Sequence, residues 1–180
     1  MEPITAALHL RDARPNEIEE VSQLLVLAYQ EYQKFLSPER WDWYRSNIVD
    51  VKGRMADSDL IVAEMNNKIV GAVTLYPHGP DQGWPEGWAG IRLLAVHPDY
   101  RGHGIGRALM EECLSRCRKS GKQTIGLHTT ELMEVARAMY ERMGFTRAPE
   151  FDFHPDPESV VFAYRLDLRD QAQKNSSPRS

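Results

Sequence analysis

The sequence predicts a mixed α/β fold with about seven strands and about four helices on the faces of the sheet. Two observations lead to this prediction. Apolar residues recur at every second position in some segments and at every third or fourth position in others, and the two kinds of segment alternate. No repeat or linker divides the 180 residues, a length close to one domain. We therefore expect a single domain over residues 1–168 and a polar, disordered tail over 169–180.

The first half of the chain is expected to form a strand, two helices and a hairpin. Ser37-Pro38 is a helix-start signal, because serine caps free amides and proline lacks the amide that would stay unbonded. Asn66-Asn67 tolerates the left-handed backbone of a tight turn. The expected elements are a strand at 8–11, helices at 18–32 and 38–56, and strands at 60–65 and 68–76.

The second half begins with a loop at 77–87, where three prolines and three glycines disfavour regular structure. Strands and helices alternate beyond it. Gly144 is suited to end the last helix in the left-handed conformation. The expected elements are a strand at 88–96, a helix at 104–120, a strand at 124–128, a helix at 132–143, and strands at 145–153 and 159–166.

Composition narrows the function classes. A net charge of −4 and a pI near 5.9 disfavour nucleic acid as a partner. The sequence contains neither an apolar run of membrane-helix length nor a signal-peptide pattern, so we expect no membrane association and a cytoplasmic location. Cys113 and Cys117 lie one helical turn apart and are expected to be reduced core residues. No metal site is expected, because suitable ligands are missing near these cysteines.

The glycine-rich segment 101–107 lies between a predicted strand and a predicted helix. Glycines there let backbone amides approach a ligand, and a helix N-terminus favours negative charge, so the segment suits an anion. A dinucleotide fingerprint fails, because it would need glycine where Arg107 or Leu109 stands. A nucleoside-triphosphate loop fails as well, because Gly106 is followed by arginine rather than lysine.

Two separate motifs identify a family. Arg101, Gly104 and Gly106 fill the pattern Q/R-x-x-G-x-G/A, and residues 136–145 fill A-x-x-x-Y-x-x-x-G-F. With both motifs, the chain resembles the GNAT superfamily of acyl-CoA N-acyltransferases over residues 8–167. The resemblance implies a mostly antiparallel sheet whose central strands splay apart and form a notch for coenzyme A (CoA).

The same resemblance implies acetyl-CoA as the acyl donor. The glycine loop would bind its pyrophosphate, with charge added by Arg101 and Arg107, and the strand before the loop would bind pantetheine and supply a backbone N–H for the oxyanion. His103 could assist with phosphate or simply face solvent. The implied CoA-binding residues are Leu94, Ala95, Val96, Arg101, Gly102, His103, Gly104, Ile105, Gly106 and Arg107.

For catalysis, the resemblance assigns Tyr140 as general acid or stabiliser of the leaving thiolate. Many relatives carry a glutamate base where this chain has Gly90, and an asparagine where it has Met133. The base must then come from elsewhere: Glu86 and His128 are the candidates, although a solvated loop glutamate and a structural histidine are the competing interpretations.

The expected function is transfer of an acetyl group to a primary amine of a small molecule or peptide. The alternatives are a non-catalytic acyl-CoA sensor and an acetyltransferase for protein lysines or N-termini. Five aromatic residues, together with many acidic ones, suit either a cationic acceptor or an ordinary core: Trp41, Trp43, Tyr44, Trp84 and Trp88. The oligomeric state, monomer or homodimer, is left open.

Overall fold

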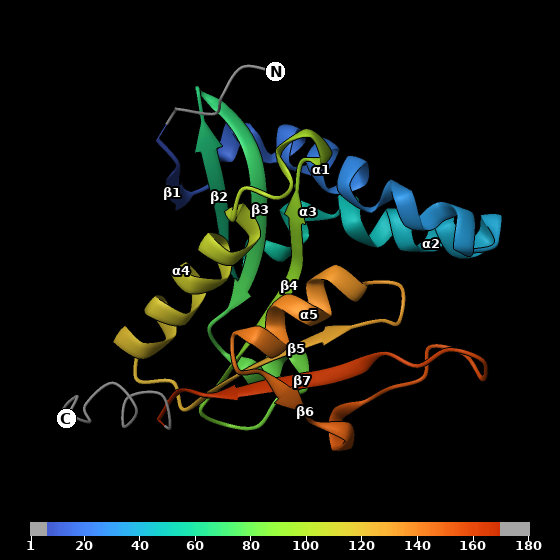
Figure 1. The fold of residues 1–180 in the computed structure, drawn as a ribbon, viewed down its shortest axis with the longest axis vertical. Helices are drawn as coiled ribbons and strands as arrows, with labels where there is room; N and C mark the ends of the chain where they lie inside the picture. The colour runs from blue at the N-terminus through green and yellow to red at the C-terminus, as the bar shows by residue number, and fades with distance from the viewer. Residues whose placement is uncertain (1–6, 170–180) are drawn as a thin grey trace. The chain divides into compact units, whose positions relative to one another are not determined.

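A computed structural model describes residues 7–169, which form two compact units. The first unit contains residues 7–75 and 93–112, and the second contains 76–92 and 113–169. Figure 1 labels the helices and strands. In chain order they are β1 (His9–Asp12), α1 (Ile18–Tyr29), α2 (Pro38–Val49), α3 (Val51–Arg54), β2 (Asp59–Met65), β3 (Lys68–Tyr76), β4 (Trp88–Val96), α4 (Ile105–Lys119), β5 (Thr124–Thr129), α5 (Glu134–Arg142), β6 (Thr146–Arg147) and β7 (Phe162–Asp167).

The strands follow the order β1-β2-β3-β4-β5-β7-β6. The strand β4 passes from the second unit into the first at Leu93. Its early residues run parallel to β5, whereas β1-β2, β2-β3, β5-β7 and β6-β7 are antiparallel. The predicted mixed α/β fold with seven strands is confirmed. The described residues contain one α-helix more than expected, the four-residue α3.

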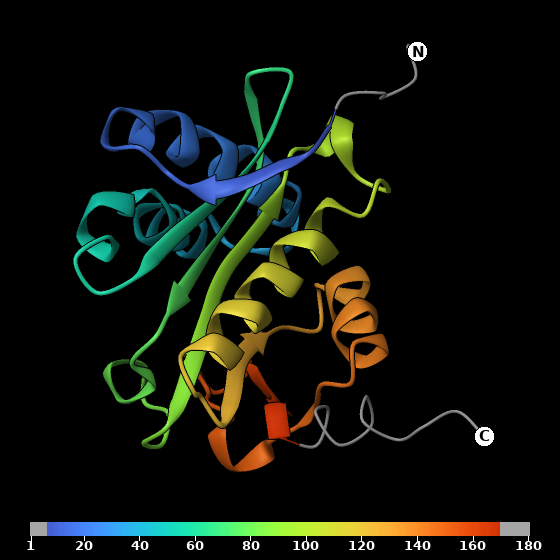
Figure 2. The ribbon, with the colours of Figure 1, turned by 90° about the vertical axis from the view of Figure 1, so that its left-hand side faces the viewer.

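In the first unit, helices cover both faces of the strands β1 to β3. The helices α1 to α3 lie on one face and the first turns of α4 lie on the other (Figures 1 and 2). Gly71 in β3 allows close packing of α4, because a Cβ there would stand 3.0 Å from side-chain atoms of Ile105 and Leu109. On the other face, the Ser22 hydroxyl donates to the Val49 carbonyl at 3.0 Å and joins α1 to α2.

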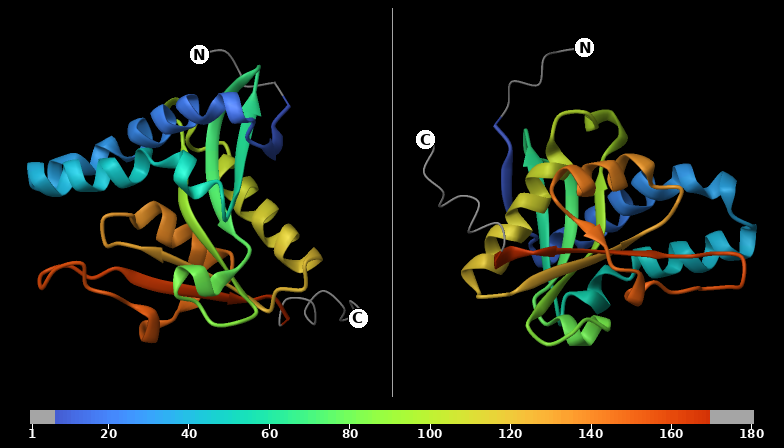
Figure 3. Two further views of the ribbon diagram at one scale, coloured as in Figure 1. Left: turned by 180° about the vertical axis from the view of Figure 1, so that it is seen from behind. Right: turned by 60° about the horizontal axis from the view of Figure 1, so that its bottom comes forward.

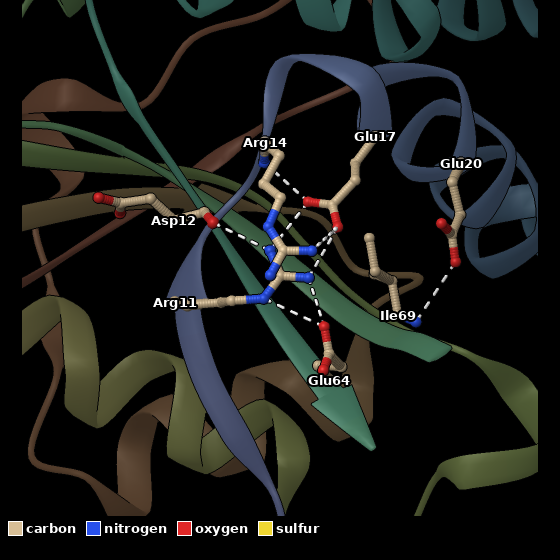
Figure 4. A network of polar contacts seen from close by, with 7 residues as sticks. All are labelled: Arg11, Asp12, Arg14, Glu17, Glu20, Glu64 and Ile69. Atoms are coloured by element: carbon tan, nitrogen blue, oxygen red, sulfur yellow. Dashed lines mark hydrogen bonds and ion pairs between the residues drawn. The ribbon is translucent and has the colours of Figure 1, made fainter. Parts of the chain in front are cut away.

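A cluster of charged residues around Arg11 ties β1 to the start of α1 and to β2 (Figure 4). The Arg11 guanidinium donates to both carboxylate oxygens of Glu17, at 2.8 and 2.7 Å, and to Glu64. Glu17 also accepts from the Arg14 amide at 2.7 Å. The hydrogen bond from Arg11 is the main reason that the pKa of Glu17 falls to about 2, while the pKa of Arg11 rises. This pairing keeps Glu17 ionised well below its ordinary pKa of 4.5.

In the second unit, α5 lies on one face of the strands (Figures 1 and 3), and the Trp84 side chain packs on the other. Tyr164 in β7 donates to Glu141 of α5 at 3.0 Å, so its side chain points to the α5 face. Trp84 packs instead against Gly126, whose β7 partner is the next residue, Arg165. Because successive side chains in a strand point to opposite faces, Trp84 lies on the face away from α5.

Several local predictions are confirmed. The Ser37 side chain accepts from the Arg40 amide at 3.3 Å and caps α2. Asn66 and Asn67 have φ values of +51° and +58°, as the tight turn between β2 and β3 requires. Gly144 follows α5 with a φ of +99°. Short polar side chains and glycine therefore mark these boundaries correctly.

Two helix predictions in the first unit need correction. The single helix expected over 38–56 is broken at Asp50, where ψ is 57° and the carboxylate accepts from the Gly53 amide at 3.1 Å, capping α3. The helix expected to reach Tyr32 is α-helical only to Tyr29 and continues as a 3-10 helix over Gln30–Phe35. In both places the apolar spacing, on which the prediction was based, continues beyond the end of the α-helical hydrogen bonding.

The second unit also departs from the prediction. The strand expected over 145–153 is reduced to β6, because Pro149 lacks an amide for the ladder and begins a 3-10 helix, Pro149–Phe151. The helix expected from 132 begins at Glu134. The predicted tail lies outside the described residues except for Arg169.

Within residues 7–169, no helix is long and apolar enough to cross a bilayer. Within the same residues, Cys113 and Cys117 on α4 are buried and form no disulfide, as expected for core positions.

Candidate functional site

The glycine loop before α4 is open. Gly102 and Gly104 have φ values of +80° and +76°, and a Cβ at either position would meet no atom within 4 Å. The first helical bond runs from the Ala108 amide to the Gly104 carbonyl at 3.0 Å, so the amides of Ile105 and Gly106 precede the hydrogen-bonded ladder. Positive φ values and open space together expose main-chain groups at the N-terminus of a 15-residue helix. This arrangement suits an anion.

The charged side chains of the loop are engaged with acidic and carbonyl groups. Arg101 donates to the carbonyl of Ala28 at 3.0 Å and pairs with Glu31 at 3.0 Å. Arg107 pairs with Glu111, also at 3.0 Å. Both arginine side chains remain substantially exposed, at 41% and 56%, so water screens these ion pairs. His103 is exposed on the loop.

The last four residues of β4 start at Leu93, whose backbone is in the left-handed conformation. Leu93 has a φ of +53°, unusual for a side chain larger than asparagine. The register between β4 and β5 covers only the earlier part of β4 and reaches Ile91 opposite Leu127. Ala95 is buried at 4% exposure, whereas Leu94 and Val96 are partly exposed. The backbone conformation therefore changes immediately before residues 94–96, the strand segment that the family resemblance assigns to the cofactor.

The direction of the backbone groups in this segment follows from contacts with β3. The His97 amide donates to the Val70 carbonyl at 2.8 Å, and the Ala95 carbonyl lies 3.2 Å from the Cβ position of Gly71. His97 and Ala95 thus face β3. Since successive residues of a strand direct their N–H and C=O groups to alternate sides, Leu94 and Val96 direct theirs away from β3.

In the second unit, Gly90 lies beneath Trp84. A Cβ at Gly90 would stand 2.9 Å from the indole Nε1, and one at Gly126 would stand 2.7 Å from Cε2 of the same indole. Trp84 is only 5% exposed, although it belongs to the predicted loop. The indole therefore occupies the space where a side chain at Gly90 would project. An isolated glycine inside a strand is the sequence signal for such a close approach.

His128 in β5 belongs to the same aromatic cluster. Its ring stacks on Trp84 with centroids 4.7 Å apart, and Phe153 meets it edge-on at 5.1 Å. Its Nε2 lies 2.9 Å from the Phe151 carbonyl, so Nε2 carries the proton in the neutral ring and Nδ1 holds a lone pair. Burial is the main cause that lowers the pKa of His128 below 6.5. The imidazole is neutral at pH 7.

The remaining predicted catalytic positions lie elsewhere in the second unit. Tyr140 on α5 is 6% exposed and packs against Phe145 with ring centroids 5.8 Å apart. Glu86 is exposed in the loop before β4. Met133 lies immediately before α5 and does not cap it with its side chain. Because α5 and Trp84 cover opposite faces, Tyr140 and His128 belong to different sides of these strands.

Two buried hydroxyls of this region were not anticipated from the sequence. The Thr129 and Thr130 hydroxyls at the end of β5 are buried without a hydrogen-bond partner among the described residues. Threonine is common in strands, so nothing in the local pattern distinguishes these hydroxyls from ordinary strand residues.

The aromatic residues considered for an acceptor are divided between core and surface. Trp41 is 6% exposed and contacts Tyr44 at a centroid distance of 6.3 Å, whereas Trp43 is 64% exposed. Trp88 stacks on Trp84 at 5.7 Å. Most of these residues pack against one another. Among the described residues, no group of three His, Cys, Asp or Glu side chains could hold a metal ion.

A family model agrees with the motifs. Residues 18–145 match the model described as the acetyltransferase (GNAT) family. A mycothiol acetyltransferase from Geodermatophilus obscurus is 30% identical over 115 residues, which cover 61% of this chain and 36% of that protein. Human N-acetyltransferase 8B is 29% identical over 149 residues, covering 73% of this chain and 63% of that protein. The chain thus spans between about a third and two thirds of the length of these curated relatives.

Solved structures agree on the fold. PaiA N-acetyltransferase from Thermoplasma acidophilum, solved in complex with coenzyme A, aligns with a TM-score of 0.71 at 15% identity, over 87% of this chain and 98% of that one. A GNAT-family acetyltransferase from Staphylococcus aureus aligns with a TM-score of 0.70 at 16% identity, over 90% and 99%. At these identities, the agreement concerns the fold.

Proposed function

Since the chain belongs to the GNAT acetyltransferase family, we propose that it transfers the acetyl group of acetyl-CoA to a primary amine of a small molecule or peptide. The observation that carries the proposal is the open loop at Gly102 and Gly104, next to the N-terminus of α4. Its amides can surround a pyrophosphate without any side chain in the way. The acetyl-CoA complex of a Brucella melitensis relative, 25% identical with a TM-score of 0.59, adds support for the donor.

The donor would be held mainly by main-chain groups. We assign the pyrophosphate to the amides of residues 101–107 and the pantetheine to backbone groups of Leu94, Ala95 and Val96. Arg107 and His103 are exposed and add polar groups beside the loop. Arg101 contributes charge while its guanidinium anchors the loop to Ala28 and Glu31. Loss of a single arginine should therefore matter less than distortion of the loop backbone.

In the reaction, the amine lone pair attacks the thioester carbonyl, a C–N bond forms, the C–S bond breaks, and the amine loses one proton. The protein must therefore stabilise the oxyanion, stabilise the departing thiolate and accept the proton of the amine. A backbone N–H pointing away from β3, that of Leu94, is suited to stabilise the oxyanion. Tyr140 is the proposed partner of the thiolate. A phenol pKa of about 10 exceeds a thiol pKa of about 8.5, so full proton transfer is uphill by about 2 kcal/mol, and Tyr140 is better suited to donate a hydrogen bond.

His128 is the proposed base. Trp84 occupies the space above Gly90, and Glu86 is solvent-exposed, which leaves the neutral imidazole as the better-placed acceptor of these candidates. Nδ1 can take a proton because Nε2 is held by Phe151. Since the lowered pKa keeps the ring neutral above pH 6.5, the acidic limb of kcat/KM should lie below that pH. In His128→Gln the fall of kcat/KM at acidic pH should disappear. A pH profile of kcat/KM that is unchanged in that variant would remove His128 from the mechanism.

The test of the function uses acetyl-CoA with a panel of small amines and N-terminal or lysine peptides. We expect release of free thiol together with an acetylated product detected by mass. Peptide-only turnover would favour the protein acetyltransferase alternative. Donor binding without turnover across the panel would contradict the proposal and favour the acyl-CoA sensor.

We retain the cytoplasm as the proposed location and propose neither nucleic acid nor membrane as a partner. The buried thiols Cys113 and Cys117 are consistent with a reducing compartment.

A further inference from the structure

One side chain of the first unit reaches the backbone segment that we assign to the donor. Tyr29, the last residue of α1, is 8% exposed. Its hydroxyl donates to the Leu94 carbonyl at 2.8 Å, across 65 positions of sequence. The ring is fixed by Tyr32 and Tyr44, whose centroids each lie 6.0 Å away. The hydroxyl position is therefore set by packing.

The bond falls on the side of β4 that faces away from β3. Ala95 and His97 direct their backbone groups toward β3, so the N–H and C=O of Leu94 lie on the opposite side. This is the side on which a thioester oxygen can meet the Leu94 amide. The Tyr29 hydroxyl thus contacts the same residue that presents the proposed oxyanion donor.

The contact between Tyr29 and Leu94 has two physical effects. The first is to hold the backbone: Leu93 lies in the left-handed region, so the strained backbone leading into Leu94 depends on contacts such as this one to keep its conformation. In addition, an uncapped carbonyl beside a developing oxyanion would repel it, and a hydroxyl that donates to that carbonyl reduces the repulsion. A fixed, capped carbonyl leaves the N–H as the dominant dipole on this side of the strand.

The same end of α1 also holds the glycine loop. The Ala28 carbonyl, near the negative end of α1, accepts from Arg101, and Glu31 in the following 3-10 helix pairs with the same guanidinium. Residues 28, 29 and 31 therefore contact both ends of the segment 94–101. Their common role is to fix that segment.

We propose that Tyr29 is a positioning residue for acetyl transfer: its hydroxyl fixes and caps the Leu94 carbonyl, so that the Leu94 amide is presented to the thioester oxygen. The inference rests on the proposed function. It assigns Tyr29 no proton transfer and no contact with the reacting atoms. Its effect should appear in the chemical step rather than in donor binding.

The first test compares Tyr29→Phe with Tyr32→Phe, a matched loss of a hydroxyl from the same aromatic cluster. Tyr29→Phe should lower kcat about tenfold, equivalent to about 1.4 kcal/mol, and should leave KM for acetyl-CoA and Kd for CoA within about twofold. Tyr32→Phe should retain kcat within about twofold. Equal kcat in Tyr29→Phe and wild type would overturn the inference. A loss of CoA affinity and melting temperature that accounts for the drop in kcat would also overturn it, because that pattern indicates a structural role.

The second test is spectroscopic and needs no turnover. The infrared band of the ¹³C-labelled thioester carbonyl of acetyl-CoA should move to lower frequency on binding to the wild-type chain, and this shift should shrink in Tyr29→Phe but not in Tyr32→Phe. An unshifted band in bound wild type, or the same shift in Tyr29→Phe, would overturn the inference even if that variant is less stable. Wild type that binds no acetyl-CoA would instead contradict the proposed function, so the two failures are distinguishable.

Discussion

Glycines serve opposite purposes in the two units. In the first unit, Gly102 and Gly104 have positive φ values and empty space around them. In the second unit, Gly90 and Gly126 belong to strands and have no space at all, because the Trp84 indole lies within 3 Å of the Cβ positions. The first pair leaves main-chain groups accessible to a ligand, and the second pair lets one side chain lie flat on the strands.

The difference corresponds to different roles in the proposed function. The first unit offers backbone groups for donor binding and for the oxyanion, while the second offers the side chains of Tyr140 and His128. Substitutions in the glycine loop of the first unit should thus change affinity for CoA, whereas substitutions of Tyr140 or beneath Trp84 in the second unit should change kcat or the stability of the aromatic cluster. Three predictions test this comparison, and a fourth concerns the charged cluster of the first unit.

The largest effect is expected at Tyr140. Tyr140→Phe should lower kcat about 100-fold, since hydrogen bonding to the departing thiolate is lost, and should leave Kd for CoA nearly unchanged. Steady-state kinetics and calorimetry measure the two quantities. Tyr164→Phe is the control, because it removes a buried hydroxyl of the same unit that is bonded to Glu141. Wild-type kcat in Tyr140→Phe would exclude Tyr140 from the chemical step.

The next effect concerns packing under the tryptophan. Gly126→Ala should lower the free energy of unfolding by about 2 kcal/mol, because the new Cβ collides with the Trp84 indole at 2.7 Å. Urea denaturation of Gly126→Ala, Trp84→Leu and the double variant measures the coupling. The double variant should lose clearly less than the sum of the single losses. Strict additivity would mean that the indole does not rest on Gly126.

A smaller effect is expected in the open loop. Gly104→Ala should weaken CoA binding about tenfold, because alanine resists a φ of +76° and the loop amides shift. Gly83→Ala is the matched control, since Gly83 has a φ of +79° and equally empty surroundings but lies outside the loop. Both variants should lose similar stability, but only the first should lose affinity. Equal affinities would contradict donor binding by the glycine loop.

The smallest effect concerns the charged cluster of the first unit. The folded-state pKa of Glu17, about 2, lies below its ordinary value of 4.5, so its contribution to stability is present above pH 4.5 and is lost as the pH falls toward 2. Glu17→Gln should cost about 1 kcal/mol at pH 7 and less at pH 3, measured by urea denaturation. The exposed Glu19 carboxylate accepts from the Gln23 side chain at 3.1 Å, and Glu19→Gln should cost little at either pH. A cost for Glu17→Gln that does not change with pH would contradict this account.

Local signals in the sequence were sufficient for the order of elements. Ser37, the Asn66-Asn67 turn and Gly144 act through their own backbone chemistry, and the structure has boundaries at each of them. The limits of β4 are also those expected. Apolar spacing was less reliable where a polar side chain competes with the helix, as at Asp50, whose carboxylate caps the following turn.

The candidate site was predictable only where it is built from backbone. The loop motif depends on glycines at fixed spacing, which are visible in the sequence. The position of Trp84 depends instead on two glycines in different strands that come together only in the folded sheet. The bond from Tyr29 to Leu94 joins residues far apart in sequence, and periodicity identifies Tyr29 only as a core residue.

The most direct test of the central claim is calorimetric titration of CoA into the wild-type chain. If the amides exposed at Gly102 and Gly104 bind the pyrophosphate, the titration should saturate at one CoA per chain with a Kd below about 100 μM, and Gly104→Ala should weaken it. Absence of saturable heat up to about 1 mM CoA, with the protein shown to be folded, would contradict the account.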